Sequence, residues 1–207
     1  MKLEIMPNHG PNAAVESIRK HRQAFSHGVV SARSMIDYGL EGGVPMEPLE
    51  TNIESDVVSV GPYLPRVKMN YQLYQATANR LAMQLMVAVG DSYKTNMSGW
   101  KDAEEPEVQF LRHIRNAAAH NNQIKFESPE DPRENTHWEG FSLTREMEGR
   151  QVFPDFSKII VGTETVEFEE GFFEAGDAFS LASDVLAILV ERSDYTHDDI
   201  RDPLDTQ

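Results

Sequence analysis

The residues best suited to chemistry in this chain lie in the segment PEVQFLRHIRNAAAH, residues 106–120. Arg115 and His120 are five positions apart, and Asn116 directly follows the arginine. A guanidinium binds phosphate oxygens through paired N–H donors and stabilises negative charge that develops on them. An imidazole exchanges protons near neutral pH, which removal of a ribose 2′-OH proton and protonation of a leaving 5′-oxygen both require. These residue types therefore suit phosphodiester cleavage without a metal ion.

A helical wheel over residues 106–120 separates an apolar face from a polar face. The apolar face holds Phe110, Leu111, Ile114, Ala117 and Ala118. The polar face gathers two arginines, an asparagine and two histidines over about 160°, namely Arg112, Arg115, Asn116, His113 and His120. Arg115 and His120 lie about 140° apart on this wheel. They converge on one ligand only through the reach of the arginine, fraying of the helix end, or a second chain.

The Arg-x4-His spacing is by itself weak evidence, because a chain of this composition gives about 0.4 matches by chance. It occurs three times, at Arg22–His27, Arg115–His120 and Arg192–His197. The last pair lies among aspartates that repel a phosphate, and the first lies in the middle of a predicted helix. Only the middle pair combines a helix end, a following asparagine and small neighbours. The alternative for that pair is a surface arginine and a histidine that caps the helix.

Hydrophobic periodicity predicts the elements that position these residues. Helices are expected over residues 13–38, 66–95, 106–120 and 172–192, and β-like runs over 137–146 and 158–170. The predicted fold is mainly α, a bundle of four to five helices with a small β-hairpin appendage between the third and last long helices. We expect a single domain over residues 1–207. Within it, residues 126–170 form a β-rich insertion and residues 194–207 a flexible acidic tail.

One further predicted feature is the loop over residues 41–65, which is punctuated by proline and glycine and has a short β-like run at 56–60. A loop of this length is uncommon unless it is functional or mobile, so it is interpreted as a lid or an edge strand.

Charge and composition limit the function classes. The formal net charge is −15, but residues 1–126 hold 13 acids and 13 Lys or Arg, so residues 127–207 carry all of the excess. The neutral part can present a local basic face, and residues 13–35 carry a net charge of +3. The absence of cysteine excludes disulfides, thiolate metal sites and a cysteine nucleophile. No apolar run reaches the roughly 20 residues of a membrane span, and a cytoplasmic setting is expected.

The segment RNAAAH at Arg115–His120 resembles the signature of the HEPN superfamily, in which Arg, a polar residue, a few small residues and His end the third helix of an all-α bundle. The preceding LRHI and the order of the predicted helices are also similar, over residues 13–126 and 171–193. The resemblance implies a metal-independent endoribonuclease that works as a homodimer and leaves a 2′,3′-cyclic phosphate. It also implies a role in toxin–antitoxin, abortive infection or antiviral defence systems.

Carried over to this chain, the resemblance makes Arg115 the phosphate and transition-state group, His120 the acid and base, and Asn116 the polar residue after the arginine. The RNA contacts proposed outside the motif are Arg112, His113, Arg22 and Lys125. The expected partners are RNA, a second copy of the chain, and an antitoxin or another defence protein; no metal, cofactor or membrane is expected. Where one toxin branch has tyrosine two residues after the histidine, this chain has Asn122. Regulation by modification of that tyrosine is therefore not expected.

Three alternatives stay open at the level of sequence. His113, His120 and His137 could ligate a metal, although no carboxylate stands at a ligand-like step beside them. Trp100 and Trp138 could stack on RNA bases, although a structural role is the commoner one for tryptophan. The chain could also be a non-catalytic, HEPN-like binding or regulatory protein.

Overall fold

The computed structural model describes residues 10–40, 50–53, 56–59, 71–126, 136–154 and 170–200. Its helices are α1 (Gly10–Leu40), α2 (Tyr71–Asn96), α3 (Pro106–Ala119) and α4 (Ala175–Val190). Within the described residues the fold is mainly helical, with two small antiparallel two-stranded sheets. The mainly α prediction is therefore confirmed.

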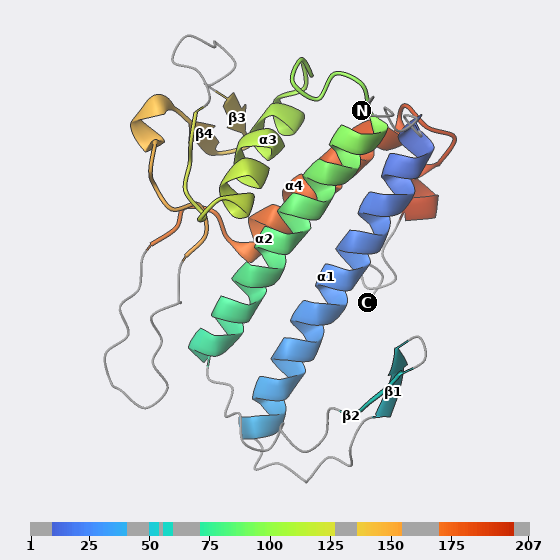
Figure 1. The fold of residues 1–207 in the computed structure, drawn as a ribbon, viewed down its shortest axis with the longest axis vertical. Coiled ribbons are helices and arrows are strands. Elements are labelled where there is room, and N and C mark those ends of the chain that lie inside the picture. The colour runs from blue at the N-terminus through green and yellow to red at the C-terminus, as the bar shows by residue number, and fades with distance from the viewer. Residues whose placement is uncertain are drawn as a thin grey trace, which may run out of the picture.

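The two longest helices, α1 and α2, run antiparallel and side by side, and α4 packs against both (Figure 1). The buried faces follow the helical spacing seen in the sequence, with Ile18 and Phe25 from α1, Leu85 and Val89 from α2, and Leu189 from α4. The shorter α3 lies beside the C-terminal half of α2 and also contacts α4. The core between these helices therefore fixes the position of α3.

The fourth helix begins three residues later than the sequence predicted. Its first residue is Ala175, and a capping box precedes it: the backbone N–H of Glu174 donates to the Asp177 carboxylate at 2.8 Å. This reciprocal cap satisfies N–H groups that the first turn leaves free, so it fixes where the helix starts. Phe172 is thus placed before the helix, partly buried against the core.

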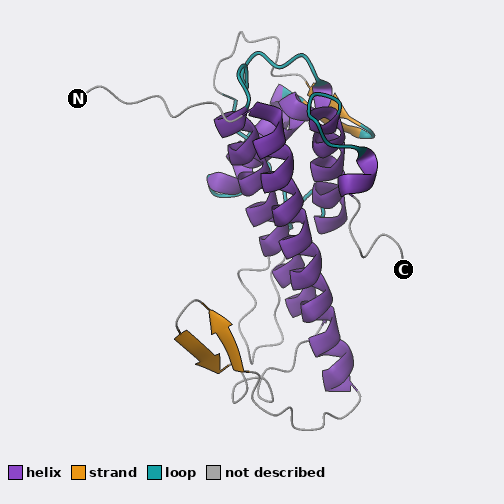
Figure 2. Ribbon diagram, turned by 90° about the vertical axis from the view of Figure 1, so that its right-hand side faces the viewer, coloured by secondary structure: helices purple, strands orange, loops and turns teal. Residues whose placement is uncertain are grey.

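A small β-structure follows α3, as predicted for the insertion. Strands β3 (Thr136–Trp138) and β4 (Phe141–Leu143) form an antiparallel hairpin beside α3 (Figure 2). The predicted run 158–170 lies outside the described residues apart from its last residue. A second hairpin, β1 (Glu50–Ile53) and β2 (Asp56–Ser59), falls within the predicted 41–65 loop. The rest of that loop also lies outside the described residues.

Aromatic side chains attach the β3–β4 hairpin to α3. Trp138 is buried, and its ring lies 5.7 Å from that of Phe110 on α3 and 5.8 Å from that of Phe141 on β4. The Trp138 indole N–H donates to the Asp184 carboxylate of α4 at 2.8 Å. These contacts give Trp138 a structural role, because its ring faces are covered and its one donor is used.

The predicted flexible tail needs a correction over its first seven residues, 194–200. Asp194 exchanges two hydrogen bonds with the Asn12 side chain at the start of α1, at 2.8 and 3.0 Å. Residues His197–Ile200 form a short 3-10 turn that buries Ile200. These contacts tie the segment to the helical body. Residues 201–207 lie outside the described part of the chain.

No helix in the described ranges combines the length and the apolar composition that crossing a membrane requires.

Candidate functional site

Helix α3 begins and ends at residues whose chemistry explains both positions. Pro106 occupies its first turn, where a missing N–H costs nothing, and Glu107 adds a negative charge near the N-terminus. The helix ends at Ala119, and Asn121 has a left-handed φ of 63°. The Asn122 N–H then donates to the Ala117 carbonyl at 2.8 Å, the reach expected of a Schellman-type C-terminal cap. The motif residues 115–120 therefore lie at a sharply terminated helix end.

Arg115 is held by two side chains in a defined orientation. Its Nε and Nη2 both donate to Asp91 Oδ1 of α2, at 3.1 and 2.6 Å, and its Nη1 donates to Asn116 Oδ1 at 3.3 Å. The Arg115 side chain is 20% exposed and that of Asp91 is 49% exposed. Because Asp91 occupies the Nε–Nη2 edge, the terminal Nη1–Nη2 edge retains N–H donors for another acceptor. A phosphate is an acceptor that matches this geometry.

Gly90 makes this arrangement possible because α2 and α3 approach closely there. A Cβ atom on Gly90 would lie 2.5 Å from Cγ and 3.0 Å from Cβ of Arg115, and 3.3 Å from the Trp100 ring. Distances below 3.0 Å force a neighbour to move, and here the neighbour is the root of the arginine side chain. Because Gly90 has no side chain, the space beside α2 at this position is free for Cβ and Cγ of Arg115.

His120 lies immediately after the last helical residue and is exposed. Its φ of −134° and ψ of 79° are outside the helical region, although its backbone N–H still donates to the Ala117 carbonyl at 3.0 Å. Within the described ranges its imidazole has no hydrogen-bond or ion-pair partner. The wheel angle of about 140° between Arg115 and His120 does not apply, because the backbone has left the helix at His120.

Asn122 anchors the turn that follows His120. Its side-chain amide donates to the Phe153 carbonyl at 2.7 Å, and its side-chain oxygen accepts from the Phe153 N–H at 2.9 Å. Asn122 is buried and has a φ of 59°, so two consecutive non-glycine residues adopt the left-handed conformation. Such pairs persist only where surrounding contacts hold them, which these two hydrogen bonds do. The turn after His120 is therefore fixed from outside the helix.

Arg112 and His113 are buried, which the helical wheel did not predict. Arg112 is 9% exposed and His113 is 5% exposed. The His113 ring lies 5.3 Å from that of Phe126, in the segment that returns past α3. The first turn of α3 is covered as well, since the Gln109 side chain donates to the backbone carbonyls of Lys101 and Ala103. Segments outside α3 therefore bury part of its polar face.

The remaining predicted RNA contacts differ in accessibility. Arg22 is buried in α1, with its guanidinium carbon 4.5 Å above the Phe179 ring of α4. This contact accounts for Arg22 through packing and cation–π attraction, so the expectation of an accessible phosphate contact at this position does not hold. Lys125 is exposed in the segment after the α3 cap. Among the predicted site residues, Arg115 and Asn116 are thus partly exposed, and His120 and Lys125 are exposed.

The other predicted alternatives can be placed too. Trp100 is partly buried, with its ring 5.6 Å from that of Tyr93. In the part of the chain that the structure describes, no group of three or more His, Asp or Glu is arranged to hold a metal ion.

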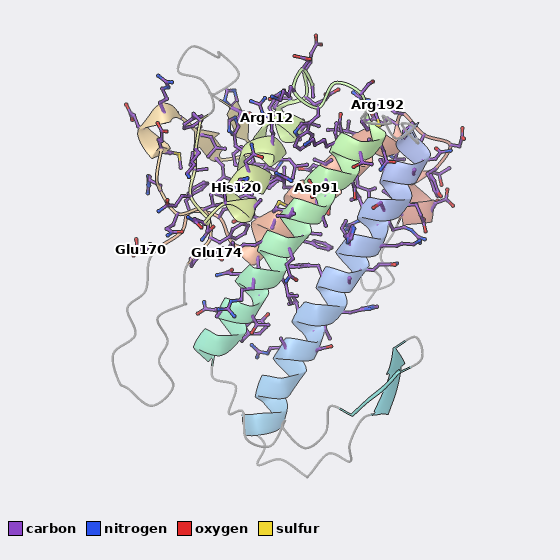
Figure 3. The ribbon with its side chains drawn as sticks, in the orientation of Figure 1. Asp91, Arg112, His120, Glu170, Glu174 and Arg192 are labelled. Carbon is purple, nitrogen blue, oxygen red and sulfur yellow. The ribbon has the colours of Figure 1, made fainter. Side chains whose placement is uncertain are left out.

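Sequence reasoning missed Asp91, Gly90 and Asn122. Asp91 carries a visible signal, since it is the one acidic residue of α2. Gly90 directly precedes it in a helix interior, where glycine is unfavourable without a packing reason. Asn122 gave no usable signal, because its partner is 31 positions away in the chain. Figure 3 shows Asp91 on α2, with His120 at the end of the neighbouring α3.

Comparisons with known proteins add nothing to this geometry: no family model, curated protein or solved structure matches the chain.

Proposed function

We propose that this chain is a metal-independent endoribonuclease of the HEPN type, in which Arg115 and His120 cleave RNA. The observation that carries the proposal is the end of α3. There an arginine pre-oriented by Asp91 and Asn116 keeps N–H donors on its terminal edge. An exposed histidine that has no partner among the described residues follows five residues later. The mainly helical fold and the hairpin between α3 and α4 agree with the arrangement that the resemblance implies.

The reaction uses groups that this site supplies. The imidazole of His120 takes the proton of the ribose 2′-OH, and the 2′-oxygen attacks the neighbouring phosphorus. The bond from phosphorus to the 5′-oxygen breaks, and a protonated imidazole returns a proton to that leaving oxygen. The Arg115 guanidinium stabilises the extra negative charge on the phosphoryl oxygens in the transition state. The products are a 2′,3′-cyclic phosphate and a free 5′-hydroxyl.

A homodimer completes the proposal. The two imidazoles of a dimer would provide a base and an acid at the same phosphodiester, which one histidine in one protonation state cannot do. The role proposed for the cell is that of a toxin or an antiviral defence nuclease acting on RNA. An antitoxin or another defence protein would control it.

The direct test is cleavage of a labelled RNA in the presence of EDTA. We expect wild-type cleavage to persist, with 2′,3′-cyclic phosphate ends, and Arg115→Ala to lose activity by about 10²–10³-fold, as for removal of one transition-state donor. An Arg80→Ala control, at an exposed arginine of α2, should cleave like the wild type. Cleavage that EDTA abolishes, or that survives Arg115→Ala, contradicts the proposal.

A second candidate is a non-catalytic, HEPN-like RNA-binding or regulatory protein. The observation that favours it is the Asp91–Arg115 ion pair, because the carboxylate compensates much of the charge that a scissile phosphate needs. The Asp91→Asn variant separates the two candidates. In the ribonuclease, loss of the orienting charge lowers kcat; in the regulatory protein, RNA binding tightens and no cleavage appears.

A further inference from the structure

Arg112 differs from the other buried arginine of the helical core. Both side chains are more than nine-tenths buried, at 9% and 6% exposure for Arg112 and Arg22. Arg22 lies over the Phe179 ring. Within the described residues, by contrast, the Arg112 guanidinium has no hydrogen bond, ion pair or ring contact. An arginine cannot shed its charge at any accessible pH, so an unpaired guanidinium in a buried position is unfavourable. An anion that pairs with this guanidinium would therefore be favourable.

The Arg112 guanidinium is nevertheless reachable from solvent. The sealed, unpartnered side-chain atoms of the described structure are Arg22 Nε, Gln109 Oε1 and Gln151 Oε1. No nitrogen of Arg112 belongs to this set, although none of them has a partner among the described residues. Arg112 is also 9% exposed, so its side chain is not completely sealed from solvent. A small anionic group can reach the guanidinium without unfolding α3.

The neighbours of Arg112 define what kind of anion fits. Arg115 and Asn116 follow it by three and four residues, so they lie on the same face of α3 at rises of about 4.5 and 6 Å. Asp91 compensates the charge of Arg115, whereas no carboxylate among the described residues compensates that of Arg112. Two guanidiniums on successive turns match an anion that repeats along a chain. Figure 3 shows Arg112 on α3, on the helix that ends at His120.

We propose that Arg112 is a second phosphate-binding group, which holds the RNA phosphate next to the one that Arg115 and His120 cleave. This inference rests on the proposed function, because it takes the polymer at Arg115 to be RNA. It assigns the two arginines different tasks. Arg112 supplies uncompensated charge for binding, and Arg115 supplies an oriented edge for the transition state.

The experiment measures RNA binding without cleavage. A fluorescent single-stranded RNA is titrated with full-length His120→Ala protein by anisotropy, over a series of salt concentrations. Adding Arg112→Gln should raise the Kd about tenfold or more, as expected for the loss of a charge-assisted hydrogen bond. It should also reduce the slope of log Kd against log salt by about 0.7, the contribution of one phosphate contact on a single strand. Arg80→Gln in the same background should change neither quantity.

A stability measurement separates ligand binding from a structural role. Without RNA, Arg112→Met should leave the thermal midpoint unchanged or raise it, because methionine fills the buried space without an unpaired charge. In the full-length His120→Ala background, RNA should raise the midpoint more with Arg112 present than with Arg112→Met added. A midpoint that falls by many degrees in Arg112→Met would assign Arg112 to the fold and overturn the inference.

The outcomes distinguish this inference from the proposed function. If wild type cleaves RNA but Arg112→Gln keeps the Kd and salt slope of its parent, the Arg112 subsite is wrong and the ribonuclease stands. If His120→Ala binds no RNA and wild type cleaves none, both fail. Poly-L-glutamate serves as a competitor: displacement of RNA at equal charge concentration, dependent on Arg112, would place a carboxylate at this position and overturn the phosphate assignment.

Discussion

Two regions of this chain carry the same Arg-x4-His spacing and use it differently. In α1, Arg22 is buried against Phe179 and His27 lies exposed in the middle of the helix. At the end of α3, Arg115 is partly exposed and oriented by Asp91, and His120 leaves the helix. A histidine in mid-helix is held at a fixed angle to its arginine, whereas one after the last turn is not. The surroundings of an Arg-x4-His pair, more than its spacing, therefore decide whether the two side chains can take part in catalysis.

The largest effect is expected from removing the two histidines in turn. His120→Ala should lower the RNA cleavage rate by about 10²–10⁴-fold, because a general acid or base is lost. His27→Ala, at an exposed position of α1, should leave the rate within about twofold of wild type. Rates are compared at saturating enzyme in single-turnover conditions. Equal rates for the two variants would remove the distinction between the regions.

The next-largest effect on the cleavage rate is expected at Gly90, which contacts Arg115, compared with Gly28, which follows His27. Gly90→Ala places a methyl group 2.5 Å from Cγ of Arg115, so the guanidinium must move, and a small misplacement costs about ten- to a hundredfold in rate. Gly28→Ala in α1 meets the flexible end of Leu81 at 2.9 Å, which can turn away. We expect Gly28→Ala to keep the cleavage rate. If Gly90→Ala also cleaves at the wild-type rate, the close approach of α2 and α3 does not position Arg115.

The arginines should show opposite patterns of stability and activity. Arg22→Ala empties a buried position and removes a cation–π contact, so it should lower the free energy of unfolding by about 1–2 kcal/mol while cleavage by the folded protein persists. Arg115→Ala breaks a partly exposed ion pair, which costs at most about 1 kcal/mol, but it abolishes most of the cleavage. Urea titrations and single-turnover rates on the same samples give both quantities. If either variant loses stability and cleavage rate in parallel, the two arginines do not divide into a structural and a catalytic one.

How much of this could be predicted from sequence depends on how local each feature is. The periodicity of α1 and α2 and the proline at the start of α3 predicted the helices, because these signals lie within each element. The helix end at His120 was predicted within one residue for the same reason. The burial of His113 and Gln109 was not, since His113 packs against Phe126 and Gln109 bonds to the segment at residues 101–103.

The partners of the candidate site were the least predictable part. Asp91 reaches Arg115 across 24 positions of sequence, and Asn122 reaches Phe153 across 31. Neither contact follows from a periodic pattern, because it depends on how two elements pack. A lone acid beside a helical glycine is the one trace that such a contact left in the sequence.

The smallest effect concerns the basic face of α1, near the Arg22–His27 pair. The Glu16 carboxylate forms ion pairs with Lys20 at 3.2 Å and with Arg19 at 3.0 Å. The hydrogen bond from Lys20 and the contacts with Arg19 lower the pKa of Glu16 below its ordinary value. A lowered pKa means that the folded protein gains stability from the charged carboxylate at neutral pH, and loses this gain as the pH falls through the lowered value.

We therefore expect Glu16→Gln to reduce the free energy of unfolding by about 0.5 kcal/mol at pH 7, as for exposed helical ion pairs. The difference from wild type should shrink towards zero as the pH falls below the pKa of Glu16. Urea unfolding of both proteins between pH 7 and pH 3 measures it. A difference that stays constant over this range would show that Glu16 does not pair with Arg19 and Lys20 in solution. Those two cations would then be free to bind RNA, and α1 would differ less from the end of α3 than the structure indicates.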